Sequence, residues 1–341
     1  MAASYWESTQ RKHWTFTKDQ LATMRQKLED EDPALVQSFG LPQLRHLNIF
    51  FNQQINRLGK RLGTRQQAMA TAQVYIKRFY TKVEIRRTNP FLVITTALYL
   101  ACKMEECPQH IRLMTQEARS LWTDMQLFHD PSKIGECEFW LISEMNSQLI
   151  IHQPYRTLTS LQSVLNLTNE EMALAWSIIN DHFMTDMPLI YPPHTIALTA
   201  ILLAIVFRPS ANSQGTGAGQ GSNSGTAALG QPNVASVNAM TAALNQLQNR
   251  TQPPTPGGSG MPGQGQSGLQ ADGASNANKM ERFSKVQRFG FWLAESNIDI
   301  EAMIDCTQEL ISFYDCQEQY NDKLTREQIV RFIKARGLDK G

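Results

Sequence analysis

The stretch Asn89-Pro-Phe-Leu-Val-Ile-Thr-Thr-Ala-Leu-Tyr-Leu-Ala-Cys-Lys103 decides the fold, because it predicts a single helix that is apolar on every face. Asn89 can accept the first free backbone N–H groups, and Pro90 suits the first helical turn since its missing donor is not needed there. No charged residue occurs from Pro90 to Cys102, so we expect this helix to be buried on all sides at the centre of a helical domain. It is shorter than the about 20 apolar residues that a membrane helix requires.

A second apolar helix is predicted over 193–207, and it repeats the first at an offset of 103 residues. The offset matches Pro90 with Pro193, Ala97 with Ala200 and Leu100 with Leu203. A repeat of this length indicates two copies of one helical domain. The copies differ at the rim of the buried helix, where Lys103 in the first is replaced by Val206 in the second.

Apolar residues spaced three and four apart predict the remaining helices. They fall near 17–28, 42–58, 64–79, 110–122 and 133–149, then 157–165, 169–185, 285–296, 299–317 and 325–337. Four of them begin with the pattern of a capping box, at Thr17, Thr64, Thr168 and Thr325. The expected fold class is all-α, with two tandem five-helix domains and flanking N- and C-terminal helices. We place the N-terminal arm and helix at 1–40, the first domain at 41–150, the second at 151–320 and the C-terminal helix at 321–341.

The segment 209–280 has a different composition and is predicted to be a disordered insert within the second domain. It holds 13 of the 20 glycines, and Arg250 and Asp272 are its only charges between 210 and 278. Such a segment has too few apolar residues to form a core. We therefore expect its deletion to leave folding largely intact.

Composition limits the classes of function. A formal net charge of +1 over 341 residues predicts neither a nucleic-acid coat nor a membrane-surface protein. Five cysteines without a Cys-x-x-Cys pair favour a reducing compartment, and the first residues lack the apolar run of a signal peptide. No cysteine–histidine set has metal-ligand spacing and no phosphate-binding loop occurs, so we expect no catalytic residue, metal or cofactor. Adjacent Ser177, Asp181 and His182 are interpreted as a chance grouping on a helix.

A basic stretch at 57–87 leaves two interpretations open. It contains nine lysines and arginines against the single acid Glu84, a local charge of +8. Nucleic-acid binding is the sharper interpretation, and a solvated helix face or contacts with acidic protein surfaces is the plainer one. We favour the plainer interpretation, because the whole chain is nearly neutral and no nucleic-acid motif accompanies the stretch.

Several short motifs identify a family for this pattern. The central helix closes with Leu100-Ala-Cys-Lys-Met-Glu-Glu106, and three aromatic residues, Tyr5, Trp6 and Trp14, lie in an N-terminal arm that we expect to dock on the fold. The other motifs are Arg65-Gln-Gln67, Tyr75-Ile-Lys-Arg-Phe-Tyr80, Glu136-Cys-Glu-Phe-Trp140, His152-Gln-Pro-Tyr-Arg156 and Tyr191-Pro-Pro193. Together they resemble the cyclin family, and within it the cyclin C subfamily in a fungal-type form with an insert in the second box. The resemblance covers nearly all of the chain outside 209–280.

The resemblance implies two cyclin boxes and a non-catalytic regulatory subunit. Its expected partners are the cyclin-dependent kinase of the Mediator kinase module, which it would activate, and the other subunits of that module. The expected location is the nucleus, and the expected role is regulation of RNA polymerase II transcription as activator or repressor, including phosphorylation of the polymerase C-terminal repeat domain. Neither direct nucleic-acid binding nor a membrane is expected.

By resemblance, Lys103 and Glu138 match the lysine and glutamate with which cyclins grip the kinase, and Glu106 is a third candidate. Lys103 ends a buried helix, and Glu138 interrupts an apolar stripe where a carboxylate without a partner would be costly. We therefore predict that Lys103 and Glu138 lie near each other on one exposed edge of the first domain. The substrate-docking patch of cell-cycle cyclins is not expected, since the corresponding residues read Leu44-Arg-His-Leu-Asn48.

Two other classes of protein remain as alternatives. A transcription-factor-B-like protein also uses paired cyclin folds, and it would bind DNA and a general transcription factor. It would be expected to carry an N-terminal zinc ribbon and a more basic composition, and this sequence has neither. A plain helical-repeat scaffold would not account for the difference between Lys103 and Val206.

Overall fold

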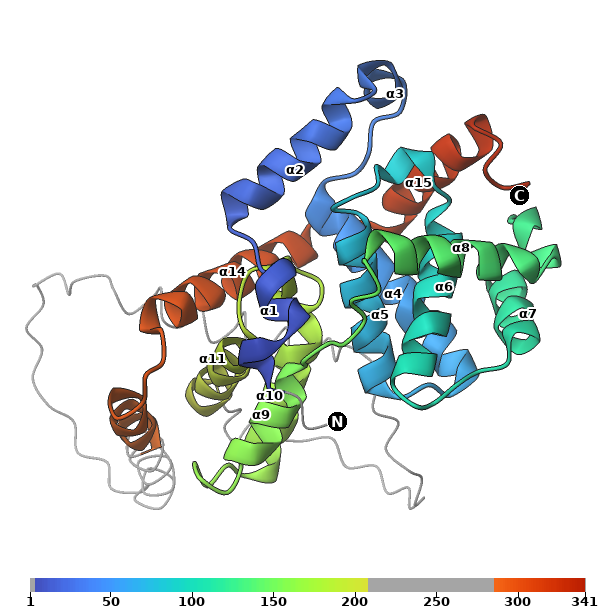
Figure 1. The fold of residues 1–341 in the computed structure, drawn as a ribbon. Helices are drawn as coiled ribbons and strands as arrows, with labels where there is room; N and C mark the ends of the chain where they lie inside the picture. The colour runs from blue at the N-terminus through green and yellow to red at the C-terminus, as the bar shows by residue number, and fades with distance from the viewer. Residues whose placement is uncertain (1–3, 208–284, 341) are drawn as a thin grey trace, which may run out of the picture.

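The computed structural model describes residues 4–207 and 285–340, and every regular element in these ranges is helical (Figure 1). The insert predicted at 209–280 lies entirely outside the described residues. Short 3₁₀ helices connect the longer elements: η1 (Tyr5–Glu7), η2 (Ile85–Arg87), η3 (Gln126–His129) and η4 (Met187–Leu189). The all-α class is confirmed.

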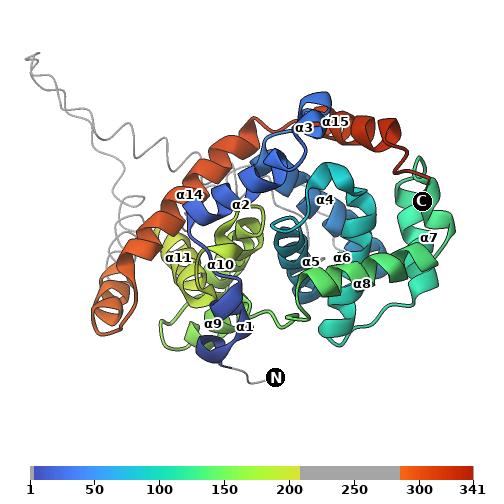
Figure 2. The same ribbon diagram turned by 45° about the horizontal axis from the view of Figure 1, so that its top comes forward.

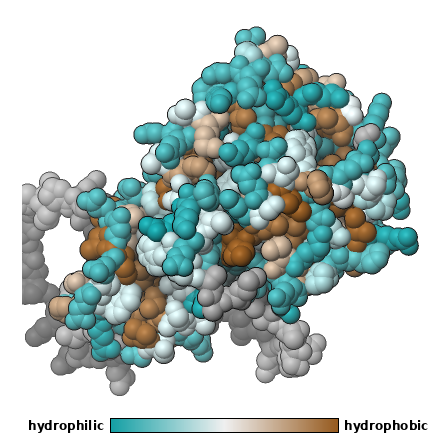
Figure 3. All heavy atoms as spheres, viewed as in Figure 1, coloured by the Kyte–Doolittle hydropathy of each residue, from teal (hydrophilic) through white to brown (hydrophobic). Residues whose placement is uncertain are grey.

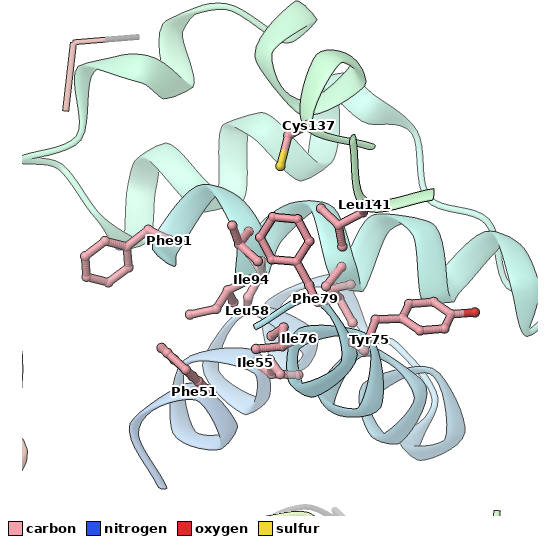
Figure 4. Packing of buried hydrophobic residues seen from close by; sticks show 14 of the residues in the cluster. Phe51, Ile55, Leu58, Tyr75, Ile76, Phe79, Phe91, Ile94, Cys137 and Leu141 are labelled. Atoms are coloured by element: carbon pink, nitrogen blue, oxygen red, sulfur yellow. The ribbon is translucent and has the colours of Figure 1, made fainter. Parts of the chain in front are cut away.

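The first bundle is arranged around the predicted central helix, α6 (Pro90–Met104). The Asn89 side chain accepts hydrogen bonds from the backbone N–H groups of Phe91 (3.0 Å) and Leu92 (3.4 Å), as the sequence predicts. Helix α6 packs against all four other helices of its bundle. These are α4 (Leu44–Leu62), α5 (Gln66–Phe79), α7 (Ile111–Leu121) and α8 (Ser132–Glu144). Figure 4 shows buried side chains from three of them, α4, α5 and α8, around α6.

The second bundle repeats this arrangement around α11 (Pro193–Val206). Helix α11 packs against α9 (Pro154–Leu161), α10 (Asn169–His182) and α14 (Ile300–Glu318). Residues 285–294 are also helical and precede α14. Ala97 and Ala200, which the repeat places in register, are both fully buried in their respective cores. The fold is therefore two tandem five-helix bundles, as predicted.

The N-terminal arm docks on the two bundles rather than fraying. Trp14 is buried in the first core, and its indole N–H donates to the Gln148 side chain at 2.7 Å. The Phe16 backbone N–H donates to the Leu189 carbonyl of the second bundle at 2.8 Å. The arm includes α1 (Thr9–His13), α2 (Lys18–Asp30) and α3 (Pro33–Ser38), and α2 begins with the predicted capping box at Thr17.

The C-terminal helix α15 (Asp322–Ala335) returns to the first bundle, where it packs against α4 (Figure 2). Its residues Ile329, Phe332 and Ile333 are buried in the first core. Beyond the helix, the Leu338 carbonyl accepts from the Asn89 side chain at 2.9 Å. The last helix of the chain thus completes the first bundle, although the whole second bundle lies between them in the sequence.

Three local predictions were wrong. Helix α5 begins at Gln66 with Arg65 at its N-cap, because the Thr64 hydroxyl donates to the Gly59 carbonyl instead of capping (3.2 Å). Helix α15 begins three residues before Thr325, since the Asn321 side chain accepts from the Leu324 N–H at 3.1 Å and provides the cap. Helix α8 ends at Glu144 rather than 149, because the chain turns there through two residues with positive φ, Asn146 and Ser147.

The central helix is also not buried on all sides. Leu92 and Tyr99 are half-buried, and Lys103 is exposed. These residues share one face of α6 by helical spacing. This partly open face leads to the candidate site.

Candidate functional site

Lys103 and Glu138 meet on the surface of the first bundle. Lys103 lies in the last turn of α6 and Glu138 in the middle of α8, and the two side chains form an ion pair. The Lys103 side chain is 39% exposed and that of Glu138 is 15% exposed. The predicted proximity of the two residues is therefore present in the free chain.

The face of Tyr99 supports the ammonium group of this pair. The Lys103 Nζ atom lies 4.5 Å from the centroid of the Tyr99 ring. A cation over an aromatic face is attracted by the ring quadrupole, by about 0.5–1 kcal/mol at an exposed site. The lysine is thus held by a carboxylate and an aromatic ring, with a third of its surface still open to a partner.

The end of α6 has a defined backbone geometry, which fixes where the lysine emerges. The Cys107 N–H donates to the Cys102 carbonyl at 2.9 Å and the Glu106 N–H to the Lys103 carbonyl at 3.3 Å. Glu106 has a φ of 53°. These two bonds around a left-handed residue form a Schellman motif, which satisfies carbonyls that a helix end would otherwise leave free.

Exposed aromatic side chains extend the site along α8. Phe139 is 81% exposed, and Trp140 is 39% exposed with its N–H donating to Glu144 at 3.1 Å. Sequence reasoning did not assign Phe139 a role. Its exposure could have been predicted from the spacing of the buried residues Ile134 and Leu141, because Phe139 lies on a different face of the helix.

Glu106 is not a member of the ion pair. Glu106 is exposed and lines a groove of about 660 Å³ between the two bundles, together with Arg65, His152 and Trp176. Its neighbour Glu105 is engaged in the fold, since it accepts from the Thr71 hydroxyl at 2.6 Å. On the face seen in Figure 1, hydrophobic side chains gather near the middle of a mostly hydrophilic surface (Figure 3).

The basic stretch 57–87 is largely occupied by contacts within the fold. Lys77 and Arg78 are buried, and four other arginines form ion pairs. These are Arg57 with Asp322 (3.5 Å), Arg61 with Glu117 (3.7 Å), Arg86 with Glu84 (2.5 Å) and Arg87 with Glu31 (3.2 Å). This distribution favours a structural role over a nucleic-acid surface.

The residues that could suggest catalysis have structural partners. Asp181 accepts from the Tyr314 hydroxyl at 3.0 Å, and the His182 ring contacts the Ile179 carbonyl. Within residues 4–207 and 285–340, no three His, Cys, Asp or Glu side chains gather in a group able to hold a metal ion. None of the helices in the same ranges is long and apolar enough to cross a membrane.

Comparisons with known proteins agree with this architecture. The family model "Cyclin, N-terminal domain" matches residues 20–150. A Neurospora crassa protein named "RNA polymerase II holoenzyme cyclin-like subunit" is 65% identical over 353 residues, covering all of both chains. A Chaetomium globosum protein of the same name is 62% identical, again over all of both chains. Among solved structures, a chain of the CAK complex from Chaetomium thermophilum bound to ATP-gamma-S is similar in fold, with a TM-score of 0.51, 18% identity, and 97% of this chain and 94% of that chain covered.

Proposed function

This chain belongs to the cyclin family as a cyclin C-like member of fungal type, and from that premise we propose that it binds and activates the cyclin-dependent kinase of the Mediator kinase module. In this role it acts in the nucleus with the other subunits of that module and regulates RNA polymerase II transcription, including phosphorylation of the polymerase C-terminal repeat domain. The chain is the regulatory subunit, and the kinase supplies ATP, magnesium and the catalytic groups. The name shared by its relatives supports the link to RNA polymerase II.

The observation that carries the proposal is the Lys103–Glu138 pair, held on the surface of a rigid bundle. A protein kinase is active only when a lysine–glutamate ion pair and its activation loop are in place. A cyclin shifts the kinase toward that arrangement by as much as it binds the active state more tightly than the inactive one. A preformed cation and anion at fixed positions suit this task, because little side-chain freedom is lost on binding.

Phe139 supplies an apolar anchor beside the two charges. Aromatic side chains that become buried at an interface account for a large part of its binding energy. In the described part of the second bundle, the position equivalent to Lys103 is Val206, which carries no charge and is 41% exposed. We therefore assign kinase binding to the first bundle, at Lys103, Glu138 and Phe139, with Glu106 at the edge of the contact.

Replacement of the charged pair tests the proposal. The double variant Lys103→Ala, Glu138→Ala should bind the kinase about 30-fold more weakly, mainly through faster dissociation, because a charged contact at an interface is worth about 2 kcal/mol at the lower end of its usual range. The helical circular dichroism and melting temperature should be unchanged. Surface plasmon resonance with the purified kinase measures the dissociation rate.

An ion pair at the other end of α6 offers a matched control. Arg87, which precedes α6, pairs with Glu31 at 3.2 Å and both side chains are exposed, so Arg87→Ala, Glu31→Ala removes one charge of each sign away from the site. For the aromatic anchor, Phe139→Ala is compared with Phe291→Ala, since Phe291 is 72% exposed on the second bundle. Equal kinase affinity for the site and control variants would refute the assignment.

A further inference from the structure

Two cysteines flank the end of the central helix, and they differ in access to solvent. Cys102 is fully buried in the first core, whereas Cys107 is half-buried in the segment that follows α6. Cys102 is three residues before the C-cap residue of α6, and Cys107 is two residues after it. Side chains at these two positions of a Schellman motif commonly touch. Both are free thiols.

The backbone holds these two residues close together. The Cys107 N–H donates directly to the Cys102 carbonyl at 2.9 Å. Disulfides join Cα atoms roughly 4.4–6.8 Å apart, so the two cysteines must be near neighbours in space, and a direct backbone hydrogen bond makes them so. The left-handed conformation of Glu106 turns the chain back toward Cys102. A disulfide here would close a ring of six residues within this turn.

The two thiols also act on each other electrostatically. Burial, together with the neighbouring Cys107 thiol, raises the pKa of Cys102 to about 12. In the described ranges, burial also raises the pKa of the other cysteines, but none of them has a second cysteine as a neighbour that contributes to the shift. These are Cys137, Cys306 and Cys316. Cys102 and Cys107 are therefore the pair poised to react together.

We propose that Cys102 and Cys107 form a two-thiol modification site, which hydrogen peroxide converts to an intramolecular disulfide at the end of α6. The Cys107 thiolate attacks the peroxide, so that an S–O bond forms, the O–O bond breaks and the leaving hydroxide takes a proton to become water. The Cys102 sulfur then attacks the resulting sulfenic acid, the S–S bond forms, and the hydroxide leaves as water with the Cys102 proton. The two thiols lose two electrons and the peroxide gains them. A thiol reductant reverses the reaction by exchange.

Peptide mapping after hydrogen peroxide treatment tests the proposal on the full-length chain. After denaturation and alkylation, the peptide that holds both cysteines should be lighter by two hydrogen atoms and carry no alkyl group. Reduction with dithiothreitol should restore both alkylation sites. Far-ultraviolet circular dichroism should show the same helix content before and after oxidation, since the disulfide forms within the existing turn.

Single variants separate this site from general thiol oxidation. In Cys102→Ala, Cys107 should stop at the sulfenic acid and be labelled by dimedone, while Cys107→Ser should leave Cys102 unmodified. Cys316 is the internal control, because it is also half-buried, on α14, and no second cysteine contributes to the shift of its pKa. It should form no disulfide. Full alkylation of both cysteines after peroxide, or Cys107 joined only to a second chain, would overturn the proposal. Because these measurements use the free chain, their outcome is independent of kinase binding.

Discussion

Replacement of Trp14 by alanine should destabilise the first bundle strongly, although this residue lies in the N-terminal arm. Its side chain is only 2% exposed, and the Arg78 guanidinium carbon lies 4.8 Å from the centroid of its ring. Truncating a buried tryptophan costs about 3–5 kcal/mol, and a desolvated cation–π contact contributes about 2 kcal/mol. These contributions overlap, since one ring makes both contacts. We expect the free energy of unfolding to fall by about 4 kcal/mol.

Urea unfolding followed by far-ultraviolet circular dichroism measures this change, and Trp6 provides the control. Trp6 lies in the same arm but is 56% exposed, so Trp6→Ala should change the free energy of unfolding by less than about 0.5 kcal/mol. Trp14→Phe keeps a ring beneath Arg78 but loses the hydrogen bond to Gln148, and it should fall between the two. If Trp14→Ala lies within about 1 kcal/mol of Trp6→Ala, the arm is not part of the first core.

Two further predictions concern buried positions. Burial raises the pKa of Asp181 to about 7, so the folded state retains a proton that the unfolded state releases above about pH 4. Stability should therefore fall as pH rises from about 4 to 7, by up to about 1.4 kcal/mol per unit, and Asp181→Asn should remove this slope; parallel urea midpoints for both proteins across that range would contradict it. At Gly59 an added Cβ would lie 2.5 Å from the Met69 sulfur, so Gly59→Ala should lower the free energy of unfolding by about 1–3 kcal/mol. Gly135 has open space around it inside α8, so Gly135→Ala should raise the free energy of unfolding by about 0.5–1 kcal/mol. Thermal unfolding compares the two variants, and equal effects would refute the packing argument.

The fold followed from the sequence wherever one physical requirement dominated. The apolar stretch after Asn89 had to lie inside a bundle, and the repeat at 193–207 required a second one. Lys103 and Glu138 were singled out by the resemblance to cyclins, and the pattern supported the choice, since one charge ended a buried helix and the other interrupted an apolar stripe. Their ion pair confirms the predicted proximity, while their role toward a kinase stays a proposal.

Predictions failed where several local partners competed. A threonine followed by glutamine three residues later is a capping signal, yet the Thr64 hydroxyl bonds the Gly59 carbonyl and Asn321 displaces Thr325 from the cap. Phe139 was overlooked because an aromatic residue on a core-facing helix normally belongs to the core. The packing of α15 on α4 could not be inferred, since hydrophobic periodicity shows which face is buried but not which distant helix covers it.

The return of α15 to the first bundle affects how this protein folds during its synthesis. Helix α4 emerges from the ribosome early, but the residues that complete its core, Ile329, Phe332 and Ile333, are among the last to be translated. Contacts between such distant segments form late and leave apolar surface exposed until they do. The first bundle must therefore wait for the second, including its long insert, to be translated before α15 can cover it. A messenger that ends prematurely after α14 would yield a chain with an uncovered first core, which chaperones and proteases would recognise even though Lys103 and Glu138 are intact.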